Sequence, residues 1–191
     1  RALLDAGVPL TTDDVKTLMA YTAEHPYPMY RWFNAHLMQS RRDADVVNGV
    51  GPYFRRFYYA LAKLPEVTVS ASRGVRVAGI PALCATFANY KQRCAPGQVL
   101  SFWGAASFTL SDAVSNKFAG SARVDSLLYA AGSVRGRIID PFTLSPTPEH
   151  EMLPLPPSLF RVLHAIMVNA KVLVIGLEQL PHAPYAYVTP P

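Results

Sequence analysis

The chain contains very little cysteine. Its 191 residues include only Cys84 and Cys94, which lie ten positions apart. No other Cys and no His stands at the short spacing that a zinc site requires, so the sequence speaks against such a site and we expect no bound metal. The two thiols could form one disulfide in an oxidising compartment or stay reduced in a reducing one, and the sequence favours neither state.

A long uninterrupted hydrophobic run is also absent. The most apolar stretch, residues 162–180, is interrupted by His164, Asn169, Lys171 and Glu178. A membrane-spanning helix needs about 20 predominantly apolar residues, so this stretch is predicted to form consecutive core strands and no membrane span is expected. No secretory leader opens the chain, although the sequence is compatible with a leader that was removed.

Charged residues make up only 16% of the chain, whereas 50% of the residues are hydrophobic. This composition is typical of a globular protein, and the length predicts one domain that covers residues 1–191. Lys and Arg number 18 against 13 acids, which gives a net charge of +5, but they form no long basic block. The pairs Arg41-Arg42 and Arg55-Arg56 are interpreted as solvated helix faces, so we expect no nucleic-acid partner.

The first 65 residues have a helical pattern. Thr11 is a candidate N-cap, followed by first-turn acids and apolar residues at helical spacing. Residues 30–38 carry a second helical apolar stripe, and residues 54–61 carry a third. Residues 49–52, which contain two glycines and a proline, are predicted to break the chain between them.

From residue 66 onward the pattern changes to alternating and β-branched segments, with one short helix predicted at residues 110–118. The predicted strands are 67–72, 75–77, 99–103, 126–130, 138–139, 151–153, 160–165 and 171–175. The sequence therefore predicts an α+β fold with a helical part at 1–65 and a β-rich part at 66–191.

Glu149 and Glu151 are separated by one residue just before a predicted strand. In an extended segment, residues i and i+2 point to the same face, whereas His150 would point to the opposite one. Two carboxylates that project together could stabilise a developing positive charge and hold or deprotonate a second group. The alternative is a pair of solvated surface acids.

Three segments together resemble the signature of the arginine-specific mono-ADP-ribosyltransferases, which consists of a strand Arg, a Ser-Thr-Ser segment and a Glu-x-Glu. Arg73-Gly74 is similar to the signature arginine, and Glu149-His150-Glu151 is similar to the Glu-x-Glu. Ser107-Phe108-Thr109 stands at the position of the Ser-Thr-Ser segment, with a different middle residue. In the helical part, Tyr21-Thr22 and Asn34 are similar to the family's Tyr-Thr and Asn-x-x-Leu pattern.

The resemblance implies an ADP-ribosyltransferase-like split mixed sheet preceded by helices, with NAD as co-substrate and transfer of ADP-ribose to arginine. Glu151 would stabilise the positive charge that develops on the ribose when nicotinamide leaves, and would hold the ribose 2′-hydroxyl. Glu149 would orient and help deprotonate the acceptor guanidinium, whose pKa lies above about 12. The partner would be a protein with an accessible arginine, and a secreted or delivered protein is favoured over a cytoplasmic one.

The remaining implied site residues bind NAD. Arg73 would contact the pyrophosphate or the adjoining ribose through its planar guanidinium, and Gly74 would permit a close backbone approach. Ser107 would brace Glu151 and the ribose, with Thr109 counted in the same group, and Phe118 would stack on nicotinamide. Each role has a structural alternative. Arg73 could be a surface strand arginine, with Arg76 taking its role, Ser107 could be an ordinary strand or turn serine, and Phe118 could be a core aromatic.

Other functions stay open at this point. Adjacent acids fit a glycoside hydrolase poorly, because its two carboxyl groups need about 5 Å or more between them. An NAD glycohydrolase of the same fold needs only water in place of arginine. A catalytically silent interaction module is suggested by the altered Ser107-Phe108-Thr109 segment. The oligomeric state is not predicted.

Overall fold

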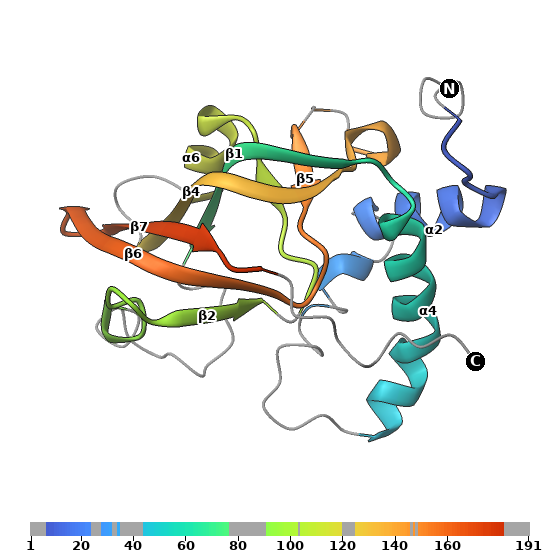
Figure 1. The fold of residues 1–191 in the computed structure, drawn as a ribbon, viewed down its shortest axis with the longest axis horizontal. Helices are drawn as coiled ribbons and strands as arrows, with labels where there is room; N and C mark the ends of the chain where they lie inside the picture. The colour runs from blue at the N-terminus through green and yellow to red at the C-terminus, as the bar shows by residue number, and fades with distance from the viewer. Residues whose placement is uncertain are drawn as a thin grey trace.

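The computed structural model describes residues 7–23, 28–31, 34, 44–76, 91–102, 104–119, 125–145, 147 and 149–181, without the side chains of 44–47, 50 and 118. Figure 1 shows a sheet with helices α2 (Thr12–Thr22) and α4 (Ala44–Ala62) packed together at one end. A third helix, α6 (Asp112–Ala119), lies against strand β1 (Glu66–Arg76). The α+β prediction with the helices first is confirmed.

Helix α2 begins where its sequence predicts. The Thr11 side chain accepts a hydrogen bond from the Asp14 backbone N–H, and the Asp14 carboxylate accepts one from the Thr11 N–H. This reciprocal capping satisfies two of the backbone donors that a helix N-terminus leaves without partners. Of the predicted helical stripe at 30–38, only residues 30, 31 and 34 are described, and all three are helical.

The predicted break at residues 49–52 is wrong. Helix α4 runs through this segment and contains Pro52 in its interior. Proline removes one intrahelical hydrogen bond, but the residues that follow bury Phe57, Ala60 and Leu61 against α2 and the sheet. Tertiary packing of this face outweighs the low helix propensity of glycine and proline.

Two pairs of predicted strands are in fact single strands. Residues 67–72 and 75–76 belong to the continuous strand β1, and residues 126–130 and 138 belong to β4 (Ser126–Ile138), whereas residue 139 follows β4 and residue 77 lies outside the described residues. These two long strands pair antiparallel from Glu66↔Arg137 to Arg76↔Ser126, with one irregularity between Val69 and Ala71. The remaining strands are β2 (Val99–Phe102), β3 (Phe108–Thr109), β5 (Glu151–Leu153), β6 (Ser158–Asn169) and β7 (Val172–Gln179).

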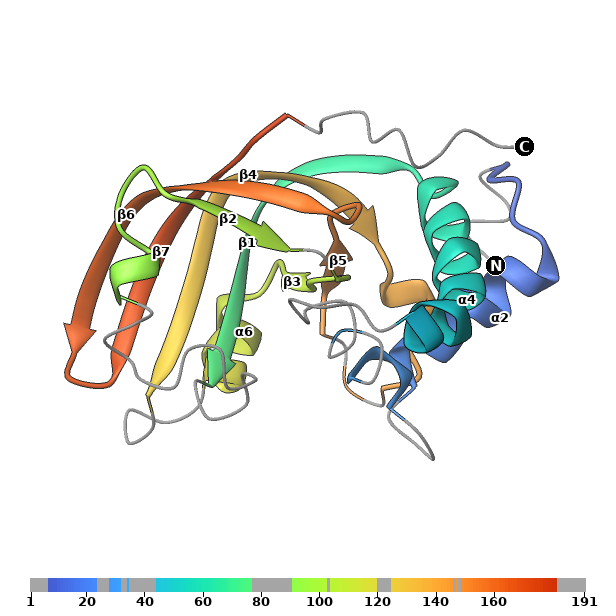
Figure 2. The ribbon, with the colours of Figure 1, turned by 90° about the horizontal axis from the view of Figure 1, so that it is seen from below.

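The sheet has the order β1-β3-β5-β4-β7-β6-β2, with β1 also paired to β4. Strands β1, β3, β5 and β4 therefore pair in a closed cycle, and β7, β6 and β2 extend from β4 as an open limb, as seen in Figure 2. The β4–β7 pair is parallel, and the other pairs are antiparallel. The short strands β3 and β5 close the cycle, and they carry Thr109 and Glu151.

Two hydrophobic clusters hold these parts together. One lies on the sheet and includes Phe108, Leu127, Phe160 and Ile175. The other joins the helices to the sheet, because Leu18 and Phe57 of the helices share it with residues of the β-rich part: Ala105, Ile139, Phe142 and Leu153. The helical part is thus packed onto the strands that carry the signature residues.

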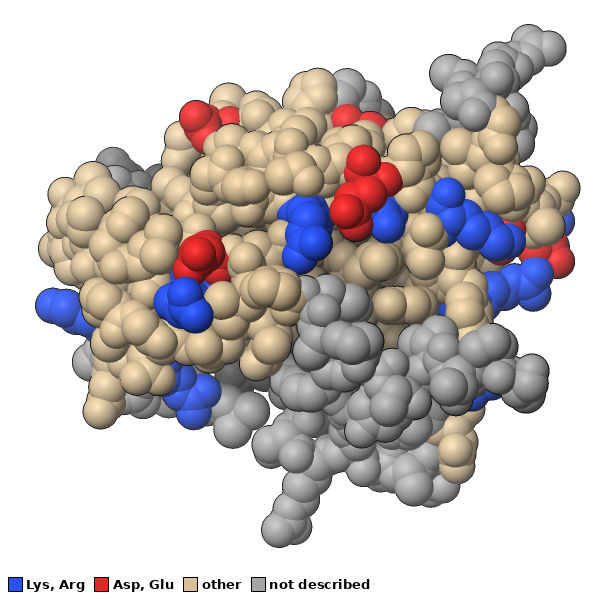
Figure 3. Space-filling view, viewed as in Figure 1, with Lys and Arg blue, Asp and Glu red and all other residues tan. Residues whose placement is uncertain are grey.

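Acidic and basic side chains are interspersed on the face seen in Figure 3. Several form ion pairs, such as Arg161 with Glu178 and Lys171 with Asp125. Among the described residues, no helix is both long and apolar enough to cross a membrane. None of them gathers three or more His, Cys, Asp or Glu side chains in an arrangement that could hold a metal ion.

Candidate active site

Arg73 and Ser107 are brought together by β1 and by the segment that leads into β3. Arg73 Nη1 donates hydrogen bonds to the Ser107 carbonyl oxygen at 2.6 Å and to Ser107 Oγ at 3.1 Å. Arg73 Nε is buried, and no described residue accepts a hydrogen bond from it. Burial lowers the pKa of Arg73, while nearby Tyr21, Tyr129 and Glu151 oppose this. A fixed guanidinium with an unused donor is suited to an oxygen-rich anion.

Glu151 begins strand β5 and lies directly opposite Thr109 of β3. Burial of its carboxyl group, followed by the nearby negative charge of Glu149, raises its pKa to about 7. A hydrogen bond from Ser107 and the positive charge of Arg73 act in the opposite direction. The Ser107 hydroxyl therefore accepts from Arg73 and interacts with Glu151, so that it links the cation to the carboxylate.

The premise that residues 149–151 are extended is wrong. His150 has φ 49°, in the left-handed region, and β5 begins only at Glu151. The backbone turn is fixed because the Leu110 N–H donates to the His150 carbonyl at 3.0 Å. The two carboxylates are nevertheless close enough for Glu149 to raise the pKa of Glu151. Their proximity comes from a turn and not from the alternation of a strand.

Thr109, predicted to bind NAD, acts on the backbone of the Glu-x-Glu segment. Its hydroxyl donates to the Glu149 carbonyl at 2.6 Å and accepts from the Ser111 N–H at 3.1 Å. The residue is buried and therefore fastens the turn before Glu151. Contact between Thr109 and NAD stays a prediction.

Gly74 is packed against helix α6. A Cβ atom at this position would collide with the Ser115 carbonyl oxygen and the Ala119 amide nitrogen. The close approach that this glycine permits is thus that of a helix, and an approach to NAD stays a prediction. The side chain of Phe118 lies outside the described part of the structure, so its stacking role also stays a prediction. Arg76 is exposed at the end of β1.

Three residues without a predicted site role also belong to this region. The Tyr21 hydroxyl of α2 and the Asn34 side-chain amide both donate to the Ala105 carbonyl, at 2.8 and 3.2 Å. Burial and the charge of Glu151 raise the pKa of Tyr21. Asp140 accepts a hydrogen bond from the Glu151 N–H at 2.7 Å. The sequence signal for Asp140 is faint: an acid before a proline, directly after a predicted strand.

Comparison with known proteins identifies the fold. No known family model matches the sequence, and no curated protein matches it. Among solved structures, the chain is similar to the ADP-ribosyltransferase Vis from Vibrio splendidus in complex with agmatine, with a TM-score of 0.69, 20% identity and coverage of 90% of this chain and 76% of that one. It is also similar to the ADP-ribosyltransferase HopU1 of Pseudomonas syringae pv. tomato, with a TM-score of 0.72, 18% identity and coverage of 94% and 82%.

The C3 exoenzyme of Clostridium limosum gives a TM-score of 0.67 at 16% identity, with 92% of this chain and 88% of that one covered. The chain has the ADP-ribosyltransferase fold. In this fold, Arg73, Ser107 and Glu149 from the three signature segments lie around Glu151, with Arg73 and Ser107 in direct hydrogen-bond contact.

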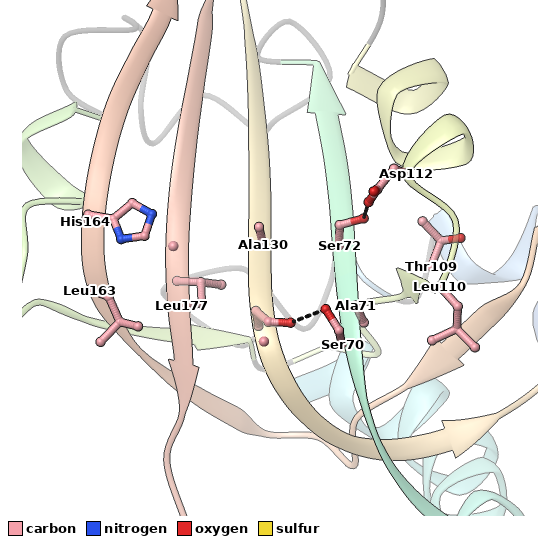
Figure 4. Close-up of a pocket in the computed structure, with 13 residues that line it drawn as sticks. Ser70, Ala71, Ser72, Thr109, Leu110, Asp112, Ala130, Leu163, His164 and Leu177 are labelled. Atoms are coloured by element: carbon pink, nitrogen blue, oxygen red, sulfur yellow. Dashed lines mark hydrogen bonds between the residues drawn. The ribbon is translucent and has the colours of Figure 1, made fainter.

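A groove of about 400 Å³ lies on the face of β1 opposite to the Arg73 side chain. Figure 4 shows Ser70, Ser72 and Asp112 along one wall and His164 along the other, with Ala130 between them. Ser72 Oγ lies 3.5 Å from Asp112 Oδ1, and Ser70 Oγ donates to the Ala131 carbonyl. Thr109 also lines this groove, so the groove and the Glu151 cluster share a wall.

Proposed function

We propose that this protein transfers ADP-ribose from NAD to arginine side chains of protein substrates and releases nicotinamide. The observation that carries the proposal is the contact of Arg73, Ser107 and Glu151 in a partly buried cluster within an ADP-ribosyltransferase fold. The cluster joins a guanidinium, a hydroxyl and a carboxylate of perturbed pKa, which is typical of a reactive site.

The residues present fit NAD. The buried Nε of Arg73 has a hydrogen to donate and no acceptor among the described residues, and its positive charge suits a pyrophosphate or ribose oxygen. Ser107 holds the Arg73 side chain in place through two hydrogen bonds. NAD would supply the ADP-ribosyl group, with nicotinamide as the leaving group. Phe118 is our candidate for the stacking contact with nicotinamide, while Gly74 and Thr109 would support the site through packing.

Glu151 is the proposed catalytic residue. Its ionised carboxylate stabilises the positive charge that develops on the ribose as the bond to nicotinamide breaks, an electrostatic effect of roughly 3 kcal/mol in comparable sites. Arg73 and Ser107 keep this carboxylate fixed and lower its pKa relative to burial alone. Because the pKa is about 7, a substantial fraction of the enzyme carries the active carboxylate near neutral pH.

Glu149 is proposed to select the acceptor. A guanidinium stays protonated unless a base withdraws its proton, and a carboxylate offers both a bidentate partner and that base. As the new bond between the acceptor nitrogen and the ribose carbon forms, Glu149 takes the proton and later releases it to water. The structure of Vis with agmatine supports this choice, since agmatine carries the guanidinium group of arginine.

NAD hydrolysis is a second candidate activity. The cluster of Arg73, Ser107 and Glu151 includes everything that cleavage requires, and water replaces arginine when no acceptor is bound. A catalytically silent module is disfavoured, because the desolvation of Glu151 beside Glu149 lowers stability, and a binding surface does not require such an arrangement. Since a type III effector of Xanthomonas axonopodis pv. citri and the Vis toxin share the fold, we also propose that this protein is delivered or secreted.

The test measures nicotinamide release and ADP-ribosyl-agmatine formation from NAD in the wild type, Glu149→Gln and Glu151→Ala. We expect both products in the wild type, nicotinamide alone in Glu149→Gln, and neither in Glu151→Ala. A wild type that consumes no NAD and gains no thermal stability from it would overturn the proposal in favour of an interaction module.

The same assay has a pH signature. Only the ionised Glu151 is active, so NAD hydrolysis should rise with pH through a midpoint near the Glu151 pKa of about 7. Glu149→Gln removes a neighbouring negative charge and should move the midpoint to lower pH. A midpoint that does not move would contradict the proximity of the two carboxylates.

A further inference from the structure

His150 has a backbone conformation that few side chains adopt. It is the non-glycine residue with positive φ among the described residues, at 49°, and it stands between the two proposed active-site acids. The left-handed region brings Cβ close to the following carbonyl oxygen, so a residue stays there only when its surroundings hold it. The contacts that hold His150 therefore decide where Glu149 lies relative to Glu151.

Asp140 contacts both residues that follow Glu149. Its Oδ1 accepts a hydrogen bond from the Glu151 N–H at 2.7 Å, and its Oδ2 lies 3.5 Å from His150 Nδ1. Its side chain is about one quarter exposed, with a relative accessibility of 26%. One carboxylate thus binds the backbone after the turn and the side chain within it.

Asp140 is itself held firmly. It begins a short 3-10 helix, Asp140–Phe142, directly after strand β4, with Pro141 in the first turn. Phe142 is buried in the cluster that joins helices and sheet, and the Thr143 N–H donates to the Asp140 carbonyl at 3.1 Å. In addition, the Ile139 N–H donates to the Glu151 carbonyl at 3.0 Å, so the backbone on both sides of Asp140 is fixed relative to β5.

The turn is held from its other side by β3. Thr109 binds the Glu149 carbonyl, and the Leu110 N–H binds the His150 carbonyl. These bonds fix carbonyl groups, whereas Asp140 fixes an N–H and the imidazole. The two sets are complementary, and only the Asp140 set involves the His150 side chain.

We propose that Asp140 is a positioning residue that holds His150 in the left-handed turn and thereby keeps the Glu149 carboxylate beside Glu151, which favours transfer to an acceptor over hydrolysis of NAD. The inference rests on the proposed function, because it assigns Glu149 to the acceptor. Asp140 touches neither substrate nor acceptor in this role. Its effect on the reaction passes through the backbone of residues 149–151.

The first test compares Asp140→Ala with Asp140→Asn and measures the ratio of agmatine transfer to NAD hydrolysis. Alanine removes both contacts, and we expect the ratio to fall at least about tenfold, which is the effect that the loss of one charge-assisted contact alone implies. Asparagine keeps an oxygen that can accept from the Glu151 N–H, so the ratio in Asp140→Asn should lie between those of the wild type and Asp140→Ala. Equal losses of transfer and hydrolysis in Asp140→Ala would reduce Asp140 to a structural residue and overturn the inference.

A second pair of variants probes the turn itself. His150→Gly enters the left-handed region without a steric penalty, so the ratio should stay within about threefold of wild type. His150→Val places a β-branched residue there, and the ratio should fall by about tenfold because the turn is displaced. A wild-type ratio in His150→Val would contradict the proposed role of the turn.

The inference can also be tested without NAD, so that its failure is distinguishable from that of the proposed function. Carboxyl NMR titration of Glu151 reports the neighbouring charge of Glu149, which raises the Glu151 pKa. In His150→Val, a displaced Glu149 should let that pKa fall, while His150→Gly should leave it near the wild-type value. An unchanged pKa in His150→Val would overturn the inference even if the wild type turns out to be active.

Discussion

Ser72 and Arg73 are neighbours on β1, and their side chains point to opposite faces of the strand. Ser72 faces the groove, where its hydroxyl makes a long hydrogen bond, 3.5 Å, to Asp112. Arg73 faces the cluster around Glu151 and makes two hydrogen bonds to Ser107, one of only 2.6 Å. The same strand therefore carries a buried Ser72 with one long side-chain contact and a partly buried Arg73 with two hydrogen bonds.

The groove is a hollow of about 400 Å³, whereas the cluster holds two groups whose pKa values are shifted. Asp112 and His164 in the groove are exposed. Around Glu151, burial and a second carboxylate raise the pKa of the acid, and burial lowers that of Arg73. Desolvation and close charges are typical of reactive groups, so the comparison makes the Glu151 cluster, and not the groove, the candidate active site.

The largest expected effect separates the two regions by activity. Glu151→Ala should lower NAD hydrolysis about 10²- to 10³-fold, because it removes the group that stabilises the developing charge. Asp112→Asn and His164→Gln change the groove and should leave hydrolysis within about twofold of wild type. Initial rates of nicotinamide release at saturating NAD measure this difference. If the groove variants lost as much activity as Glu151→Ala, the groove and the Glu151 cluster would not differ in function.

The second effect concerns stability and pH. The Glu151 pKa is raised in the folded protein from 4.5 to about 7, so the folded state binds its proton more tightly than the unfolded state. Its favourable contribution is complete below pH 4.5 and is lost as pH rises through about 7. Glu151→Gln should therefore exceed the wild type in unfolding free energy at pH 8, by up to about 3 kcal/mol.

Urea denaturation of both proteins at pH 5 and pH 8 measures this difference, and Asp112→Asn is the matched control from the groove. Because Asp112→Asn retains Glu151, it should keep the Glu151-dependent loss of stability between pH 5 and pH 8. A Glu151→Gln variant less stable than the wild type at pH 8 would mean that the carboxylate is stabilised by its surroundings, contrary to the direction of its pKa.

The third effect compares two glycines of the sheet. In Gly74→Ala, the new methyl group meets the backbone of α6, and we expect a loss of about 1–3 kcal/mol in unfolding free energy. Gly132 lines the groove and has open space where its Cβ would lie, so Gly132→Ala should keep or slightly raise the stability. Equal melting temperatures for the two variants would contradict the close packing of α6 on β1.

The smallest effect compares two serines. Ser107→Ala removes the hydroxyl that interacts with Glu151 and lowers its pKa. Hydrolysis at pH 7 should fall by about tenfold, and its pH midpoint should move upward. Ser72→Ala loses only the long contact to Asp112 and should retain the wild-type rate and midpoint. An identical pH profile for Ser107→Ala and wild type would remove Ser107 from the site.

Much of the fold could be predicted from local sequence, because capping and alternation are local properties. The Thr11 N-cap and the short helix after Leu110 are examples. Pro52 misled the prediction, since the packing of the aromatic face that follows it is a tertiary effect. Residues 73 and 74 lie outside the predicted strands, although β1 is continuous there and Gly74 leaves room for helix α6 to pack on it.

The sequence named residues of the candidate site but did not predict how the backbone arranges them. The resemblance named Arg73, Ser107 and Glu151, and the structure brings these three together. It could not reveal the left-handed turn at His150, because the bonds that hold it come from Asp140 and Leu110, which belong to other segments of the fold. The single domain across residues 1–191 stays a prediction. For Cys84 and Cys94 the sequence favours neither a disulfide nor two thiols, and Cys84 lies outside the described residues, while Cys94 is buried.

The hydrogen bond from Tyr21 to Ala105 joins residues 84 positions apart, and that from Arg73 to Ser107 spans 34 positions. Contacts of such long range form late, because closing a large loop costs entropy before the contact can repay it. Helices α2 and α4 can form from local interactions, whereas the cluster around Glu151 needs contacts between distant segments of the chain. During refolding from urea, enzymatic activity should therefore return only after the helical circular dichroism signal.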